Sequence, residues 1–182
     1  MSGEIERAIV NHCSLVLLGC KPATLFMLGS ENALVVLSAL LRPCLNLKVL
    51  RKTGGGLLVL AFEKKRLEKT LLKGNALPAL AGMGYPVGDS LFAMLDYLRK
   101  QFTGNDFPHE IGFFLGYPLE DVLGFVLHKG RNYKLCGYWK VYGDVEYARQ
   151  CFRQYDSCRE CFKIIWQYAL ITDFSVPKPA NP

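Results

Sequence analysis

The strongest structural signal in the sequence is a long helical pattern close to its C-terminal end. From Asp144 to residue 170, apolar residues recur at intervals of three and four, the spacing that places them along one face of an α-helix. Aspartate is also a residue type that favours the start of a helix. We therefore expect one long helix begun by Asp144. Its predicted buried stripe consists of Val145, Ala148, Phe152, Tyr155, Cys158, Phe162, Ile165 and Ala169.

Other segments combine helical spacing with residues that begin or end helices. Ser30 is a good N-cap residue and Pro43 stops a helix, so a helix is expected between them. Similar patterns predict helices at residues 4–13, 64–73 and 89–102. The residues predicted to face the core from the first and the last of these are Ile5, Ala8, Ile9, Cys13, Leu91, Leu95 and Leu98.

Elsewhere the apolar period changes to two, which is the period of a β-strand. Residues 45–51 alternate, and residues 57–63 follow after a glycine-rich loop, which together predict a β-hairpin. The pattern of residues 109–118 predicts a strand that leads into a helix start. The pattern of residues 134–142 predicts a further strand. Because strands and helices are segregated rather than strictly alternating, we expect an α+β fold.

The length and composition fit one globular domain. A chain of 182 residues with 51% hydrophobic residues can bury a substantial core. We expect a single domain over residues 1–171, in which helices and the long C-terminal helix pack on a small, mostly antiparallel sheet. Residues 172–182 have nothing to pack against and are predicted to form a frayed tail.

The N-terminal sequence indicates the cellular compartment. Its longest apolar run, residues 13–20, is far shorter than the roughly 20 residues that a membrane helix needs. Glu4 and Glu6 occupy positions where a signal peptide carries basic residues. We therefore expect a soluble, cytoplasmic protein with no membrane partner.

The cysteines are predicted to be reduced thiols. Their number, seven, is odd and their spacing matches no small disulfide-rich domain. Cys158 and Cys161 lie three apart on the predicted long helix, where Cβ atoms are about 5 to 6 Å apart and too distant for a disulfide. Cys13 and Cys20 could supply a second pair of metal ligands, but the segment between them is apolar. We expect no metal site, and no cofactor is indicated.

A row of lysines marks the predicted helix at residues 64–73. Lys65, Lys69 and Lys73 are four residues apart and lie on one helix face, in a chain whose formal net charge is +6. Such a row is typical of a solvated helix face. Alternatively it binds an anionic partner, such as a nucleic acid, a nucleotide or an acidic protein surface.

Two stretches, residues 84–95 and 116–127, share the pattern GYPxxDxLxxxL. Proline suits the first turn of a helix, and acidic residues after it complement the positive helix end. Both Pro86 and Pro118 are therefore interpreted as helix starts rather than as parts of a functional site. On this interpretation, replacing Asp121 with Asn costs about 1 kcal/mol or less.

Several longer motifs resemble a known family. The segments FPHEIGFFLGYPLEDVLGFV, KGRNYKLCGYWKVYGD, CKPATLF and YDSCRE are similar to those of an uncharacterised family of small proteins from anaerobic Gram-positive bacteria, known only as a domain of unknown function. The resemblance spans nearly the whole chain. It implies a stand-alone bacterial domain without an assigned activity.

A histidine and a glutamate precede the apolar residues of the predicted strand at 109–118. His109 can act as an acid, a base or a ligand-binding group near neutral pH, or both polar residues can satisfy hydrogen bonds within their own loop. Gly112 and Gly116 leave bare backbone, which permits close approach of a ligand or of another backbone segment.

The predicted strand at residues 134–142 has two different faces. Leu135, Trp139 and Val141 share one face, and the other is aromatic and basic. The second face could stack an aromatic ring and hold a phosphate, or it could pack as an amphipathic surface under a helix. Together with the preceding segment, the candidate ligand-binding residues are His109, Glu110, Tyr117, Cys136, Tyr138 and Lys140.

These residues support a primary function and two alternatives. The primary hypothesis is a cytoplasmic binding module for a small anionic or aromatic ligand. The first alternative is an enzyme in which His109 activates Cys136 and Glu110 orients the histidine. The second is a domain that binds an acidic protein or a nucleic acid through its basic helix.

Overall fold

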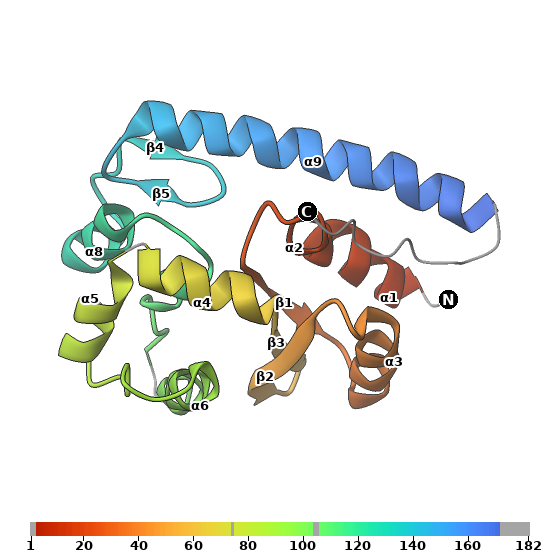
Figure 1. The fold of residues 1–182 in the computed structure, drawn as a ribbon, viewed down its shortest axis with the longest axis horizontal. Coiled ribbons are helices and arrows are strands. Elements are labelled where there is room, and N and C mark those ends of the chain that lie inside the picture. The colour runs from red at the N-terminus through yellow and green to blue at the C-terminus, as the bar shows by residue number, and fades with distance from the viewer. Residues whose placement is uncertain (1–2, 74, 104–105, 172–182) are drawn as a thin grey trace.

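The computed structural model describes residues 3–73, 75–103 and 106–171 (Figure 1). It confirms an α+β fold in which helices pack on a small antiparallel sheet. The predicted frayed tail, residues 172–182, lies outside the described residues, and the extent of the domain stays a prediction. None of the described helices is long and apolar enough to cross a membrane.

The main sheet contains, within the described part of the chain, strands β1 (Ala23–Leu28), β2 (Asn46–Thr53) and β3 (Gly56–Phe62). Their order is β1-β3-β2 and both pairings are antiparallel, so the predicted hairpin of β2 and β3 is confirmed. No element was expected at β1. Its sequence, ATLFML, is apolar at five of six positions and lacks the alternation by which strands are recognised.

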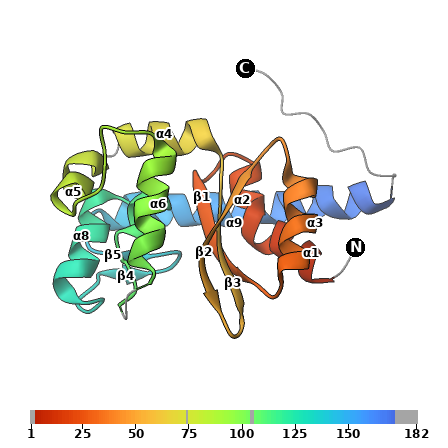
Figure 2. The same cartoon turned by 90° about the horizontal axis from the view of Figure 1, so that it is seen from below.

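The sheet separates two groups of helices, because successive side chains of β3 point to opposite faces (Figure 2). Leu60 and Phe62 pack with one group, made of α4 (Lys64–Lys73), α5 (Ala76–Gly82), α6 (Leu91–Gln101) and residues 111–122. Val59 and Ala61 pack with the other group, which consists of α1 (Gly3–Arg7), the π-helix Ala8–Cys13, α2 (Ser14–Leu17) and α3 (Glu31–Leu41).

The remaining elements build the part of the molecule that holds the candidate site. They are α7 (Ile111–Phe114), α8 (Leu119–His128), β4 (Leu135–Cys136), β5 (Lys140–Val141) and α9 (Val145–Ile171). At about 1.5 Å per residue, α9 is about 40 Å long. It runs from the β4–β5 hairpin to α1 and α2 and so lies along both halves of the protein (Figure 1).

The predicted helix starts are confirmed at Ser30 and Asp144. The Ser30 hydroxyl accepts a hydrogen bond from the amide of Ala33 at 3.1 Å, and α3 ends at Leu41, just before Pro43. The Asp144 carboxylate accepts from the amides of Glu146 and Tyr147 at 2.9 and 3.0 Å. Each cap satisfies amides at a helix start that lack partners within the helix.

The buried stripe of α9 is confirmed over most of its length. Ala148, Tyr155 and Phe162 are buried, whereas Ile165, which was predicted to be inside, is 49% exposed. Trp166 takes the inward position instead, because the stripe continues from Phe162 at an interval of four rather than three. The side chain of Ala169 lies outside what the structure describes.

Two strand predictions are wrong. Residues 109–118 form a turn, the short helix α7 and a left-handed glycine, Gly116, with φ of +79°. Residues 111–115 are buried on all sides, and such an apolar run does not distinguish a strand from a buried helix. Residues 134–142 form not one strand but the tight hairpin of β4 and β5, in which Leu135 pairs with Val141.

The two GYP stretches have different structures. After Pro118, α8 begins at Leu119 as predicted. The prediction is wrong for Pro86, which is followed by a turn; α6 begins only at Leu91 and is capped by the hydroxyl of Ser90. Shared residues therefore do not make the two stretches equivalent.

Candidate functional site

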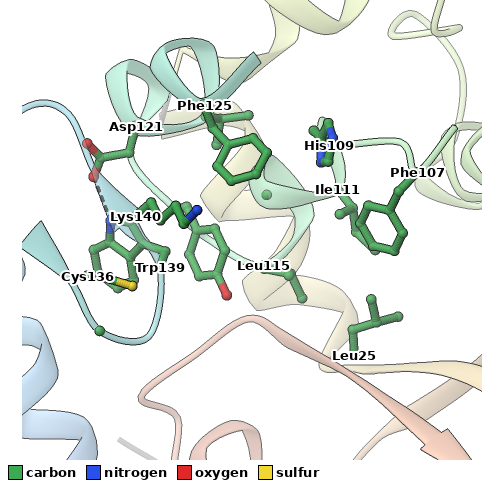
Figure 3. A pocket seen from close by; sticks show the side chains of 14 residues that line it. Leu25, Phe107, His109, Ile111, Leu115, Asp121, Phe125, Cys136, Trp139 and Lys140 are labelled. Atoms are coloured by element: carbon green, nitrogen blue, oxygen red, sulfur yellow. Dashed lines mark hydrogen bonds between the residues drawn. The ribbon is translucent and has the colours of Figure 1, made fainter. Parts of the chain in front are cut away.

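A cavity of about 300 Å³ lies where the α7–α8 segment meets the β4–β5 hairpin (Figure 3). Its walls come from the loop before α7, from α7 and α8, from the hairpin and from Leu25 of β1. They are formed by Leu25, Phe107, His109, Ile111, Gly112, Leu115, Tyr117, Asp121, Val122, Phe125, Cys136, Gly137, Trp139 and Lys140.

Close packing explains the two glycines of the α7–α8 segment. A Cβ atom at Gly112 would lie 2.7 Å from a methyl carbon of Val122, and one at Gly116 would lie 2.8 Å from the ring of Pro22. The Tyr117 amide then bonds to the carbonyl of Gly112 at 2.9 Å, which closes the turn and presents the tyrosine ring to the cavity. These glycines permit the approach of other protein segments.

A buried carboxylate ties α8 to the hairpin. Asp121 is 3% exposed and accepts hydrogen bonds from the indole N–H of Trp139 at 2.6 Å and from the amides of Tyr142 and Gly143 at 2.7 and 2.8 Å. The bond to Trp139 is visible in Figure 3. Hydrogen bonds to a charged acceptor are stronger than those between neutral groups. Asp121 is thus a structural anchor that fixes the position of the Trp139 wall.

Aromatic rings line much of the cavity. Tyr117 stacks on Trp139 with ring centroids 5.0 Å apart, and Phe125 lies against His109 at 4.6 Å. His109 also contacts Phe107 at 5.6 Å. These contacts hold the rings at separations typical of aromatic pairs in protein interiors. The cavity is therefore preformed and largely apolar.

Lys140 provides a positive charge beside these rings. Its ammonium lies 5.6 Å from the ring centre of Phe125 and 4.9 Å from that of Tyr133, and it donates one hydrogen bond to the carbonyl of Gly130 at 2.8 Å. Figure 3 shows Lys140 and His109 on either side of Phe125. An ammonium has three donors, so Lys140 keeps donor capacity for a ligand.

The structure brings together four of the six predicted site residues, since His109, Tyr117, Cys136 and Lys140 all line the cavity. The remaining two are not among the lining residues. Glu110 accepts a hydrogen bond from the Tyr85 hydroxyl at 2.9 Å, and Tyr138 donates to the carboxylate of Asp156 on α9 at 2.7 Å.

Other lining residues were not identified from the sequence. Phe107, Phe125, Asp121 and Trp139 contribute rings and the anchoring carboxylate. Asp121 and Trp139 are buried and Phe125 is half-buried, but burial alone does not distinguish a cavity wall from a filled core, and Phe107 is 46% exposed in a loop. In the sequence, Asp121 stands out only as an acidic residue in the first turn of a predicted helix, directly before an apolar residue.

A buried lysine lies behind the Tyr117 wall. Lys21 is 6% exposed, and its ammonium is 5.1 Å from the ring centre of Tyr117 and 5.9 Å from that of Tyr155. Burial, together with the nearby positive charge of Arg159, lowers the pKa of Lys21 to about 8. Cation–π contacts with the two rings partly replace the water that the ammonium has lost.

The described residues contain no group of three or more histidine, cysteine, aspartate or glutamate side chains placed to hold a metal ion. All seven cysteines are free thiols in the structure. Cys136 and Cys161 are exposed, whereas Cys13 is buried, and burial raises the pKa of the Cys13 thiol to about 12.

Thiol labelling is expected to follow this order of exposure. Under native conditions an alkylating reagent should modify Cys136 and Cys161 first and Cys13 last, since only an accessible thiolate reacts. Under denaturing conditions all seven thiols should react. Mass spectrometry of digested protein measures each site, and Cys136→Ser serves as the control that removes one fast site. Rapid native labelling of Cys13 would contradict the structure.

Comparison with protein-family models matches residues 9–172 to a family described as "Protein of unknown function (DUF3793)". No curated protein and no solved structure matches the chain.

Proposed function

Since the chain belongs to the DUF3793 family, whose description assigns no function, we propose from the geometry of the site that it is a cytoplasmic binding module. The cavity between the α7–α8 segment and the β4–β5 hairpin takes a small aromatic ligand that carries an anionic group. The observation that carries this proposal is the position of Lys140 at the edge of an aromatic cavity.

The aromatic part of the ligand follows from the walls. Phe107, Phe125, Tyr117 and Trp139 offer ring faces and edges, and a volume of about 300 Å³ is at the lower end of the range for small-molecule sites. Stacking of a ligand ring on these side chains replaces water next to apolar surface, which favours binding. A compact ligand of one or two rings suits this space.

The anionic part follows from the charges. Asp121 is the only acidic residue among the described lining residues, and three donors already occupy its carboxylate. Lys140 forms no ion pair with any described residue. An anion next to Lys140 would therefore gain a charge-assisted hydrogen bond without displacing an existing carboxylate partner.

A thiol enzyme is less well supported. His109 and Cys136 do line the same cavity, but the predicted orienting residue, Glu110, bonds to Tyr85 instead. Nucleophilic catalysis of this type depends on a base that is itself oriented by a third group. Binding requires only the groups that the cavity already presents.

A matched pair of probes tests the proposal. Naphthalene-2-sulfonate and naphthalene-2-sulfonamide have the same rings and nearly the same size, but only the sulfonate is charged. We expect the sulfonate to bind more tightly, and Lys140→Gln to weaken its binding by about tenfold to a hundredfold, because a charge-assisted hydrogen bond contributes about 1.5 to 3 kcal/mol. Binding of the sulfonamide should change little. Isothermal titration calorimetry measures both affinities.

Lys134→Gln is the control variant. Lys134 also belongs to the hairpin region and also donates to a backbone carbonyl, that of Gly143 at 3.0 Å, but it does not line the cavity. Equal losses in the two variants would show that general surface charge attracts the sulfonate, and the proposal would be wrong. If neither probe binds, the proposal that the cavity takes an aromatic ligand would be wrong as well.

A further inference from the structure

Tyr117 also lines a second cavity, of about 580 Å³, between α4 and the start of α8. This cavity differs from the first in its charge, since Arg66, Lys69 and Lys73 all border it. The hydroxyl-bearing side chains Thr70 and Tyr147 complete its polar lining. We propose that this second cavity binds a phosphorylated small molecule with two or more negative charges.

The cationic side chains share one face of α4. Arg66, Lys69, Thr70 and Lys73 are separated by three and four residues, which places them in adjacent turns on the same side of the helix. Lys65, which the sequence grouped with Lys69 and Lys73, is exposed and is not part of the lining. Of the three lysines in this row, Lys69 and Lys73 therefore line the cavity and Lys65 does not.

These charges are not neutralised within the described structure. None of the described lining residues is acidic, and Arg66, Lys69 and Lys73 form no ion pair with any described residue. Lys64, on the same helix, does pair with Glu68. Like charges grouped at one concave surface repel each other, and a bound polyanion removes that repulsion.

Arg66 is held in place by the protein. One guanidinium nitrogen donates to the carbonyl of Val16 at 3.1 Å, and the Arg66 amide donates to the carboxylate of Glu63 at 2.7 Å. A guanidinium has five N–H donors, so several stay available to phosphate oxygens. Because its position is already fixed, Arg66 loses little conformational entropy when an anion binds.

The start of α8 adds to the positive potential. Pro118 and Leu119 line the cavity. The first amides of the helix that bond within it are those of Asp121 and Val122, which both donate to the carbonyl of Pro118. Amides before that point carry the positive end of the helix dipole.

Two acidic residues in the first turn of α8, Glu120 and Asp121, reduce the positive potential of the cavity only weakly. Asp121 is buried and bonded to three donors of the hairpin, and the side chain of Glu120 lies against Gly143, also on the hairpin side. Lys21 adds a positive charge behind the Tyr117 ring.

The size of the cavity favours a small molecule over a polymer. A volume of about 580 Å³ lies within the range of small-ligand sites and is large enough for a phosphate group with an attached ring. Binding of single-stranded nucleic acid typically requires a basic groove with a succession of aromatic platforms. Here the aromatic lining residues are Tyr117, Tyr147 and the buried Phe113, which do not form such a succession along a groove.

Titration of the full chain with inorganic pyrophosphate tests this proposal. We expect saturable binding, and a loss of about tenfold or more in Lys69→Glu, because an attractive charge becomes a repulsive one. Lys65→Glu is the matched control, since it makes the same charge change on the same helix outside the lining. It should alter the affinity by about twofold or less. Circular dichroism checks that both variants stay folded.

Further arms of the titration decide between ligand classes. Pyrophosphate should bind more tightly than inorganic phosphate, because it carries more charge. Equal losses in Lys69→Glu and Lys65→Glu, or no binding of pyrophosphate, would overturn the proposal. Tighter binding of a single-stranded oligonucleotide than of pyrophosphate, weakened equally by both substitutions, would also overturn it in favour of a polymer. Naphthalene-2-sulfonate binding should be the same in all these variants, so the two cavities are tested separately.

Discussion

Replacement of Asp121 with Asn is expected to lower the free energy of unfolding by about 3 kcal/mol, because it leaves a buried donor facing another donor. The Asn oxygen can still accept from the amides of Tyr142 and Gly143. Its NH₂ group would then face the indole N–H of Trp139, which is 2.6 Å from the carboxylate in the native protein. Urea denaturation followed by circular dichroism measures the change.

Glu120→Gln is the matched control for this prediction. Glu120 precedes Asp121 in the first turn of α8 and has the same charge, but it is exposed. If both acids only complemented the helix end, the two substitutions would have similar effects, each about 1 kcal/mol or less. A large effect at Asp121 alone identifies the hairpin anchor. Similar effects at the two positions would restore the interpretation of Asp121 as a helix-start acid.

A double-mutant cycle locates the interaction. Trp139→Phe removes the indole donor and keeps an aromatic wall. Because the Asn side chain then meets no opposing donor, Asp121→Asn should cost less in the Trp139→Phe background than in the native protein. Additive effects of the two substitutions would show that the 2.6 Å hydrogen bond does not couple these residues.

Replacement of Lys21 with Met is expected to remove a pH dependence of stability. The pKa of Lys21 is lowered from 10.5 to about 8 in the folded protein, so a charged Lys21 opposes folding by about 3 kcal/mol at pH 7. Between pH 8 and 10.5 the unfolded state binds more protons than the folded state. The stability of the native protein therefore rises with pH in this window relative to that of the Met variant.

The stability difference between native protein and Lys21→Met is the quantity to measure. It should change by about 2 kcal/mol between pH 7 and pH 10 in favour of the native protein. Because the other titrating groups are common to both proteins, their effects largely cancel in this difference. The exposed Lys65→Met is the control and should show no such change. A constant difference across this range would contradict the lowered pKa of Lys21.

The elements with an unambiguous period were predictable from the sequence. Leu91, Leu95 and Leu98 are buried as their spacing indicated, and the β2–β3 hairpin forms around its glycine-rich loop. In α6 and β2 one face is apolar and the other polar, so the pattern reports which side meets the core, and β3 follows from its connection to β2 through the glycine-rich loop. Local sequence is then enough to define the element.

Segments that are buried on several sides were not predictable in this way. Residues 111–115 are all buried, and β1 is apolar at nearly every position, so neither shows a period. In residues 134–142 the alternation was real, but the chain reverses at Gly137–Trp139, which periodicity does not reveal. Tertiary packing decides the structure of such segments.

The candidate site was partly predictable for the same reason. Polar or reactive residues in apolar surroundings, such as His109, Cys136 and Lys140, stand out in the sequence and line the cavity. Glu110 and Tyr138 stand out equally, yet they bond to Tyr85 and Asp156, which lie far from them in the sequence. Which polar residue finds a partner depends on contacts that only the folded chain creates.

The position of α9 has a consequence for the order of events during protein synthesis. The apolar face of the N-terminal helical segment, including Ile5 and Ile9, is covered by Phe162 and Trp166, and the Trp166 indole donates to the Glu6 carboxylate at 3.3 Å. Along the chain α9 follows the N-terminal helical segment, the sheet and α3 to α8, so a ribosome makes it after all of them. The part of that face that packs on β1 and α3 can be covered early, whereas the part that Phe162 and Trp166 cover is buried only after α9 has been translated. Until α9 has been made, the growing chain exposes this part of its apolar surface, which is the kind of surface that chaperones bind.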